Sequence, residues 1–254
     1  MAWFDSHCHL DAPEYDHDRE AVVERALSAG VSRILVPAAD PRDWQRVLAC
    51  GRQFPDVVRV GLGVHPWSLP TLAPADLDEA LGSLGSRLQD SGATVVGECG
   101  LDAGINKRGV PFEVQERVVR HHIELALALN RPIVLHSVKA HGRLAALLQP
   151  YRGLRGVMHS YSGPVELIDA FVNAGLAFSF AGAISWPTSK RPLLAAAAAP
   201  DDALLVESDG PDQALHGPQG RLPRSEPAHV VELGALLERL RGRPLRDNRA
   251  ILDC

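Results

Sequence analysis

Short apolar runs alternate with longer amphipathic stretches along most of the chain. Runs such as RILVP at 33–37 and PIVL at 132–135 are almost continuously apolar, as parallel strands that are buried on both faces are. The pattern predicts eight strands, at residues 3–7, 33–37, 57–64, 94–98, 133–136, 156–159, 177–182 and 204–207.

The amphipathic stretches between these runs predict helices. Segments 18–30 and 111–130 carry apolar residues at helical spacing, and Gly30 and Asn130 at their ends are typical of helix C-caps. Strand–helix alternation repeated eight times predicts a parallel sheet that closes as a TIM (β/α)8 barrel. A doubly wound open sheet is the alternative. The same helical pattern occurs at 77–89 and 228–242.

Length and charge narrow the possible functions. The 254 residues suit one barrel domain, which we expect to span residues 1–254. A net charge of -5 at pH 7 argues against charge-driven, non-specific binding of nucleic acid. It does not exclude a nuclease, because bound metal cations can supply positive charge locally.

The cysteines and the N-terminal segment bear on the cellular location. Cys8, Cys50, Cys99 and Cys254 show neither a disulfide framework nor a zinc-binding spacing. The N-terminus has no signal-peptide pattern, and no window approaches the roughly 18 apolar residues of a membrane span. We therefore expect a cytoplasmic protein with no membrane contact. The oligomeric state is left open, and a monomer is compatible with the sequence.

Residues that can bind metal fall at or just after the ends of the predicted strands. Active sites of TIM barrels are built on this face. His7 and His9 are two residues apart, so in a strand they would point the same way while Cys8 points away. Any one of the histidines alone could be an ordinary buried or rim residue, but six such residues on one rim predict a metal site. They are His7, His9, Glu98, His136, His159 and Asp209.

The types of ligand bear on the metal. Imidazole and carboxylate groups together suit zinc, manganese, nickel or iron, and carboxylates also suit magnesium. Six ligands exceed what one catalytic zinc normally takes. They suffice for two divalent ions if Glu98 bridges them, in a pair about 3.5–4 Å apart.

Several motifs resemble those of one known family. SHCHLD, GLGVHPW, GECGLD, LHS, MHSYSG and ESDGPD occur in this order between residues 6 and 212. Together they resemble the TatD family of metal-dependent deoxyribonucleases, and within it the YjjV-like branch of hydrolases. The resemblance implies an amidohydrolase-like TIM barrel and hydrolysis of phosphodiester bonds. It implies one metal at His7, His9, Glu98 and Asp209, a second at Glu98, His136 and His159, and His65 near the substrate.

The sequence departs from the family pattern in three places. Val138 stands where the family often has Arg, and Ser208 stands where it usually has Thr. The segment PLRDNRAILDC after the last predicted helix is also shorter than the family's usual ending. We expect this third difference to affect packing around the last strand and to leave the metal site intact.

Other polar and aromatic residues near the predicted rim are weaker candidates for functional residues. Asp11 and Asp102 follow metal motifs and could orient ligands or cap loops and helices. Trp67 and Trp186 could stack a base or close the barrel mouth, and we favour closing. A phosphate-binding collar could form from Lys107, Arg108, Lys139, Arg143, Lys190, Arg191, Arg221 and Arg224, although any one of them could equally be solvated surface.

Two sets of these residues are given specific interpretations. Within the collar, Lys139 and Arg143 are our candidates for substrate binding. The remaining histidines are interpreted as surface or capping residues: His121, His122, His141, His216 and His229.

The sequence therefore predicts a metal-dependent hydrolase that cleaves phosphodiester bonds with a metal-activated water. Asp209 would accept or orient the proton of the water, Glu98 would bridge the metals, and His65 is the next candidate for the base. The expected substrate is a DNA end or single strand, because a barrel mouth admits an end more easily than the middle of a duplex.

Two alternatives remain. A small-molecule amidohydrolase or phosphoesterase could use the same barrel, but its usual variant bridges the metals with a carboxylated Lys where Glu98 stands here. An inactive binding or scaffold protein is the other alternative, and the complete ligand set argues against it.

Overall fold

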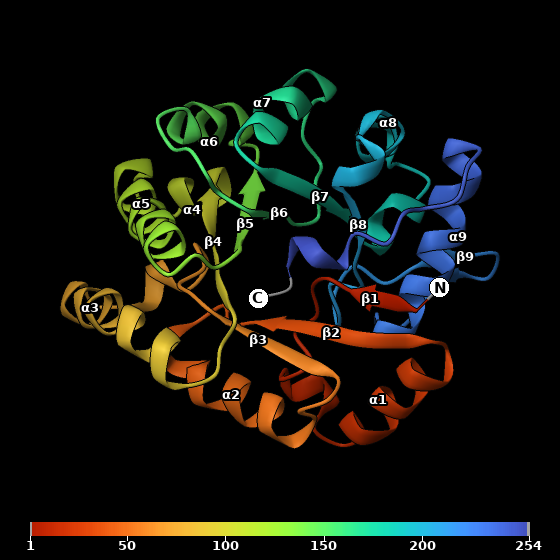
Figure 1. Ribbon diagram of the computed structural model, residues 1–254, viewed down its shortest axis with the longest axis horizontal. Helices are drawn as coiled ribbons and strands as arrows, with labels where there is room; N and C mark the ends of the chain where they lie inside the picture. The colour runs from red at the N-terminus through yellow and green to blue at the C-terminus, as the bar shows by residue number, and fades with distance from the viewer. Residues whose placement is uncertain (1, 253–254) are drawn as a thin grey trace.

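Eight parallel strands hydrogen bond in chain order from β1 to β8, and helices surround them (Figure 1). The computed structural model describes residues 2–252. Residues 1, 253 and 254, which include Cys254 and both ends of the predicted domain, lie outside the described residues. The strands are β1 (Trp3–Asp5), β2 (Val31–Pro37), β3 (Val58–Leu62), β4 (Val95–Asp102), β5 (Ile133–Val138), β6 (Gly156–Met158), β7 (Leu176–Phe180) and β8 (Leu204–Val206).

The helices follow the strands as the amphipathic pattern predicts. Gly30 and Asn130 have φ values of 89° and 49°, as expected for residues that end helices. Among residues 2–252, no helix combines the length and apolar character needed to cross a membrane. The helices are α1 (Arg19–Ser28), α2 (Trp44–Gln53), α3 (Pro74–Asp90), α4 (Ala103–Lys107), α5 (Phe112–Ala128), α6 (His141–Leu148), α7 (Ile168–Asn173), α8 (Lys190–Ala198) and α9 (Val230–Arg241).

The first and last strands meet, so the sheet closes. The backbone N–H of Ser6, just after β1, donates to the carbonyl of Val206 in β8 at 3.1 Å. A small antiparallel pair, β9 (His216–Gly217) and β10 (Gly220–Arg221), lies outside the barrel sheet. The predicted TIM barrel is confirmed, and the open doubly wound alternative is wrong.

At the barrel mouth, the predicted ends of several strands lie beyond the ends that the structure shows. His7, His159 and Glu207 were assigned to strand ends but lie just beyond β1, β6 and β8. They are as buried as strand residues, so the hydrophobic pattern does not reveal where the hydrogen-bonded ladder stops. The reverse error occurs at β4, which was expected to end at Glu98 but continues to Asp102.

An irregularity in β4 turns Glu98 into the barrel. Val95 packs in the inner core, whereas Val96 and Cys99 pack in the outer core. Strict alternation would therefore point Glu98 outward. The pairing with β5 shifts between Val96 and Cys99. Gly97 accommodates the extra residue with φ of 125°. A Cβ at this position would lie 2.7 Å from the carbonyl oxygen of Val134, which is too close for any residue other than glycine.

Below the mouth, an apolar layer fills the barrel. It is formed by inward side chains of most strands: Phe4, Leu35, Val95, Val134, Val157, Ala177 and Leu205. Such a layer makes the barrel a packed core and not a pore. The polar residues of the mouth therefore lie above a closely packed apolar layer.

The C-terminal segment completes the packing around β8. The side-chain amide of Asn248 donates to the carbonyls of Asp201 and Leu204 at 2.7 and 2.9 Å. Leu252 is buried against the inner apolar layer. The expectation of altered packing at this point is therefore not met in residues 2–252, because this short segment supplies the amide and the apolar side chain itself.

His122 is fully buried in α5, and His141 is buried at the start of α6 without capping it, so the assignment of both as surface or capping residues was wrong. The Nδ1 of His122 contacts the carbonyl of Val118 at 2.7 Å, and its Nε2 accepts the backbone N–H of Val64 at 3.1 Å. Burial lowers the pKa of His122 to about 4, which keeps the ring neutral and Nε2 free to accept. His122 thus anchors the loop that carries His65.

Replacing His122 with Leu should lower the free energy of unfolding by about 1–3 kcal/mol, because the buried N–H of Val64 loses its acceptor. The His122→Gln variant, which can still offer an oxygen acceptor, should lose less. Urea unfolding at pH 7 measures both values. Equal stability of the Leu variant and the wild type would contradict the anchoring role.

Candidate metal centre

The structure brings all six predicted metal ligands together inside the barrel mouth: His7, His9, Glu98, His136, His159 and Asp209. The expected geometry of the HxH motif is present. The Nε2 atoms of His7 and His9 lie 3.3 Å apart, while the Cys8 thiol points away and donates to the carbonyl of Gly210. Although β1 has ended, the N–H of Cys8 still bonds to Leu35 of β2, which preserves the alternation.

The two oxygens of the Glu98 carboxylate face different groups of side chains. Oε2 lies 3.3 Å from His7 Nε2 and 3.9 Å from His9 Nε2. Asp209 faces the same two histidines, with its Oδ1 at 3.7 and 3.9 Å from their Nε2 atoms. On this side, the carboxylates of Glu98 and Asp209 therefore face the imidazoles of His7 and His9.

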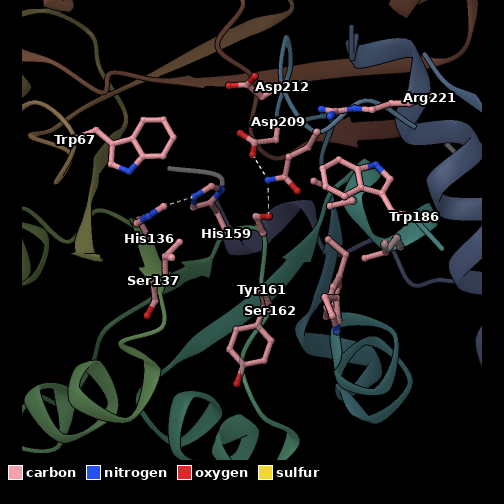
Figure 2. A pocket seen from close by; sticks show the side chains of 18 residues that line it. Trp67, His136, Ser137, His159, Tyr161, Ser162, Trp186, Asp209, Asp212 and Arg221 are labelled. Carbon is pink, nitrogen blue, oxygen red and sulfur yellow. Dashed lines mark hydrogen bonds between the residues drawn. The ribbon is translucent and has the colours of Figure 1, made fainter. Parts of the chain in front are cut away.

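The other oxygen of Glu98 faces a second group of imidazoles. Oε1 lies 2.8 Å from His159 Nε2 and 3.3 Å from His136 Nδ1. Those two nitrogens are 3.0 Å apart. Figure 2 shows His136 and His159 side by side, with Asp209 on the far side of His159. The site thus has two halves that share one carboxylate.

The family resemblance placed His65 near the substrate, but the structure places its ring next to the Glu98 carboxylate. Its Nε2 lies 3.2 Å from Glu98 Oε1. The ligand atoms of His65, Glu98 and His136 all lie within 4.8 Å of one another. The sequence signal was its place three residues after the end of β3, at the same barrel mouth where His159 directly follows β6. His65 is therefore both a candidate base and a candidate ligand.

The electrostatics of the centre favour cations. Burial opposes ionisation of Glu98, but the surrounding histidines, His159 foremost, outweigh it and hold its pKa well below the usual range. Glu98 Oε1 is buried and makes no hydrogen bond of ordinary geometry within the described chain, although three imidazole nitrogens lie within 3.3 Å. Imidazole nitrogens and carboxylate oxygens are ligands for divalent transition metals. The residues therefore fit a metal centre.

Asp209 is held in place by residues that the sequence analysis missed. Its backbone has a left-handed φ of 48° and its N–H donates to the carbonyl of His7 at 2.8 Å. Its Oδ2 accepts a short hydrogen bond from the Gln213 amide, which also contacts Ser160 Oγ at 2.6 Å (Figure 2). No sequence periodicity links Gln213 and Ser160, which come from separate loops.

Buried carboxylates support the centre from outside. Asp5 accepts from the N–H and hydroxyl of Ser208 at 2.8 and 2.6 Å, and burial raises its pKa well above the usual range. Glu207 accepts the N–H of Ser160 at 2.6 Å and lies 3.5 Å from His159 Nδ1. Such outer contacts fix the orientation of metal-binding side chains.

Asp102 serves both of the functions considered for it. Its Oδ1 caps α4 by accepting the N–H of Gly104 at 2.6 Å. Its Oδ2 accepts from Trp67 Nε1 at 2.7 Å and lies 3.6 Å from His136 Nε2. Asp11 was considered for the same two functions as Asp102. In the structure it is the backbone carbonyl of Asp11 that accepts a hydrogen bond, from the Arg19 guanidinium.

Two adjoining cavities open from the centre. One, of about 300 Å³, lies over the centre itself and is lined by His9, His65 and Glu98 among others. The other, of about 480 Å³, extends toward β7 and is lined by His136, His159, Asp209, Trp186 and Arg221 among others (Figure 2). A substrate could therefore place one group at the candidate metal centre and an adjacent group in the larger cavity.

The two predicted substrate-binding residues lie away from both cavities. Arg143 on α6 pairs with Glu113 and Glu116 at 3.1 and 2.5 Å, and stacks on the ring of Phe112. Lys139 is exposed, with a left-handed φ of 53°. Neither residue lines the cavities. Contact of either side chain with substrate stays a prediction.

Comparison with known proteins agrees with this geometry. The chain is 33% identical to the metal-dependent hydrolase YjjV of Escherichia coli over 95% of this chain and 91% of YjjV. The YjjV crystal structure matches with a TM-score of 0.83, covering 98% of this chain and 93% of that one. A 3′-5′ ssDNA/RNA exonuclease TatD of Pectobacterium parmentieri is 30% identical over 82% of this chain and 79% of its own length.

Two further matches address fold and family. An amidohydrolase structure from Saccharomyces cerevisiae has a TM-score of 0.81 over 100% of this chain and 97% of its own, at 15% identity, which shows the shared fold alone. The model of the family described as TatD related DNase matches residues 4–253. The chain therefore belongs to the TatD family.

Proposed function

We propose that this chain is a metal-dependent nuclease that removes nucleotides from the 3′ end of single-stranded DNA or RNA. The observation that carries the proposal is the division of the Glu98 carboxylate between two groups of ligands. The TatD relatives that are named 3′-5′ ssDNA/RNA exonucleases support the choice of substrate. In this proposal residues 1–254 form a single catalytic domain.

The proposed ligand sets follow the two halves of the site. His7, His9 and Asp209 would hold one divalent ion with Glu98 Oε2, and His136 and His159 would hold the second with Oε1. Two such ions supply a nucleophilic water near neutral pH and stabilise negative charge on the phosphoryl oxygens. Whether the ions are magnesium, manganese, zinc, nickel or iron depends on supply as well as on the ligands.

Asp209 is the proposed proton acceptor. Its Oδ1 faces His7 and His9, and its Oδ2 is directed toward Gln213. Oδ1 would bind a cation, and the carboxylate would accept or orient the proton of the attacking water while Gln213 holds Oδ2 in place. His65 Nε2, on the opposite side of Glu98, would then orient substrate or complete the second ion's coordination.

The protein would act in a reducing compartment. Cys8, Cys50 and Cys99 are buried and free, which is compatible with the cytoplasmic location expected from the sequence.

The proposal predicts that metal-loaded protein releases mononucleotides from the 3′ end of a labelled single strand. Chelator-treated protein should be inactive, and adding Mn²⁺ or Mg²⁺ back should restore the activity. Activity is measured on single strands, on blunt duplexes and on small phosphodiesters. Hydrolysis of the small esters without any hydrolysis of nucleic acid would instead favour the small-molecule hydrolase, and undiminished activity without metal would contradict the mechanism.

Replacing Asp209 with Asn should keep the fold and lower kcat on single-stranded DNA roughly 10²- to 10⁴-fold at saturating metal, because Asn cannot accept a proton. Asp78→Asn is the matched control, since Asp78 pairs with Arg117 on the outer helices far from the mouth. If the Asp209 variant ran within a few-fold of wild type at saturating metal, the base would have to be sought elsewhere.

A further inference from the structure

The larger cavity beside the metal centre has an apolar, aromatic wall that the ligand assignment leaves unused. Phe180 ends β7, and Ile184 and Trp186 follow in the next loop. Its volume of about 480 Å³ lies within the roughly 300–1,000 Å³ range of small-molecule sites. The opposite side of the cavity is formed by His136, His159 and Asp209.

Trp186 is held at a fixed angle in this wall. Its Nε1 donates to the carbonyl of Ala214 at 2.8 Å. The hydroxyl of Ser185 contacts the carbonyl of Gly182 at 2.6 Å and accepts the N–H of His216 at 2.8 Å. These bonds tie the loop after β7 to the β9–β10 hairpin. A ring fixed in this way loses little conformational entropy when a ligand stacks on it.

Arg221 of β10 adds a positive charge to the same wall. Its guanidinium carbon lies 4.5 Å from the centroid of the Trp186 ring, and both residues line the cavity (Figure 2). Arg221 forms no ion pair within residues 2–252, unlike Arg143 and Arg224, which are neutralised by carboxylates. A planar cation on an aromatic ring makes a stacking surface that also attracts anions.

We propose that the cavity between Phe180, Trp186 and Arg221 binds the base of the 3′-terminal nucleotide, while the phosphate of that nucleotide lies on the metal centre. The inference rests on the proposed nuclease function and specifies what part of the substrate the cavity holds. An apolar pocket with a cationic, aromatic wall fits a flat base that carries a phosphate. It would accept all four bases, because stacking depends on the ring face and not on base-edge hydrogen bonds.

The same geometry revises the interpretation of Trp186. Closing the barrel mouth would require the ring to cover the opening, but Trp186 lies in the cavity wall, across from His136 and His159 (Figure 2). Trp67 also lines this cavity, but the residue is 61% exposed and its Nε1 donates to Asp102 Oδ2. The proposal therefore assigns base stacking to Trp186 alone.

The test compares two ligands by calorimetry with metal-loaded protein. Thymidine 5′-monophosphate carries a base, whereas 2-deoxyribose 5-phosphate has the same sugar and phosphate without one. Wild type should bind the nucleotide more tightly. Trp186→Ala should weaken nucleotide binding roughly 5- to 100-fold, the loss of one stacked base, and leave the sugar phosphate unchanged. Trp186→Phe should restore most of the difference.

Arg221→Gln should weaken nucleotide binding as well, and Arg117→Gln is its matched control. Arg117 is an exposed arginine on α5 that pairs with Asp78 away from the cavities. Thermal unfolding and metal content of every variant show whether the fold and the centre are intact. Equal loss of both ligands in Trp186→Ala, or no preference for the base in wild type, would overturn the proposal.

The same titrations separate this proposal from the nuclease function on which it rests. If wild type degrades single strands from the 3′ end but does not distinguish the two ligands, the pocket assignment fails and the nuclease function stands. If wild type prefers the nucleotide through Trp186 but hydrolyses no nucleic acid, the nuclease function fails and the base-binding pocket stands.

Discussion

The buried carboxylate of Glu98 imposes the constraint on which the rest of the site depends. A carboxylate removed from water costs several kcal/mol unless it is compensated, and five imidazoles converge on this one: His7, His9, His65, His136 and His159. Five neutral imidazoles cannot all donate to the two Glu98 oxygens, which together offer about four acceptor sites. The nitrogens of His7 and His9, and those of His136 and His159, also face each other. The proposed cations on either side of the carboxylate would resolve this conflict and would stabilise the polar interior of the mouth.

The barrel meets this constraint with one local irregularity and several distant supports. Gly97 lets β4 take an extra residue, which points Glu98 inward where a regular strand would point it out. Asp5 and Glu207 then fix the loops that carry His7 and His159. His122 reaches from α5 to hold the loop that precedes His65. The centre is thus positioned by helices and strands as well as by its own loops.

Much of this arrangement could be predicted from the sequence. Parallel strands bring their carboxyl ends together, so histidines and carboxylates at those ends had to meet, and the two-residue spacing of His7 and His9 determines that they face the same way. The irregularity at Gly97 could not be predicted, because hydrophobicity records burial and not strand register. Gln213, Ser160 and His122 were missed for another reason: each acts through a contact between segments far apart in the chain, which no local pattern encodes.

The bridge that we propose Glu98 to form between two metal ions is tested most directly by counting bound metal. Protein purified with excess Mn²⁺ and then desalted is analysed by mass spectrometry for metal per chain, with His17→Ala as control because that side chain is 73% exposed. Wild type and the control should retain two ions, His159→Ala mainly one, and Glu98→Ala almost none. Two ions retained in Glu98→Ala would contradict the bridge.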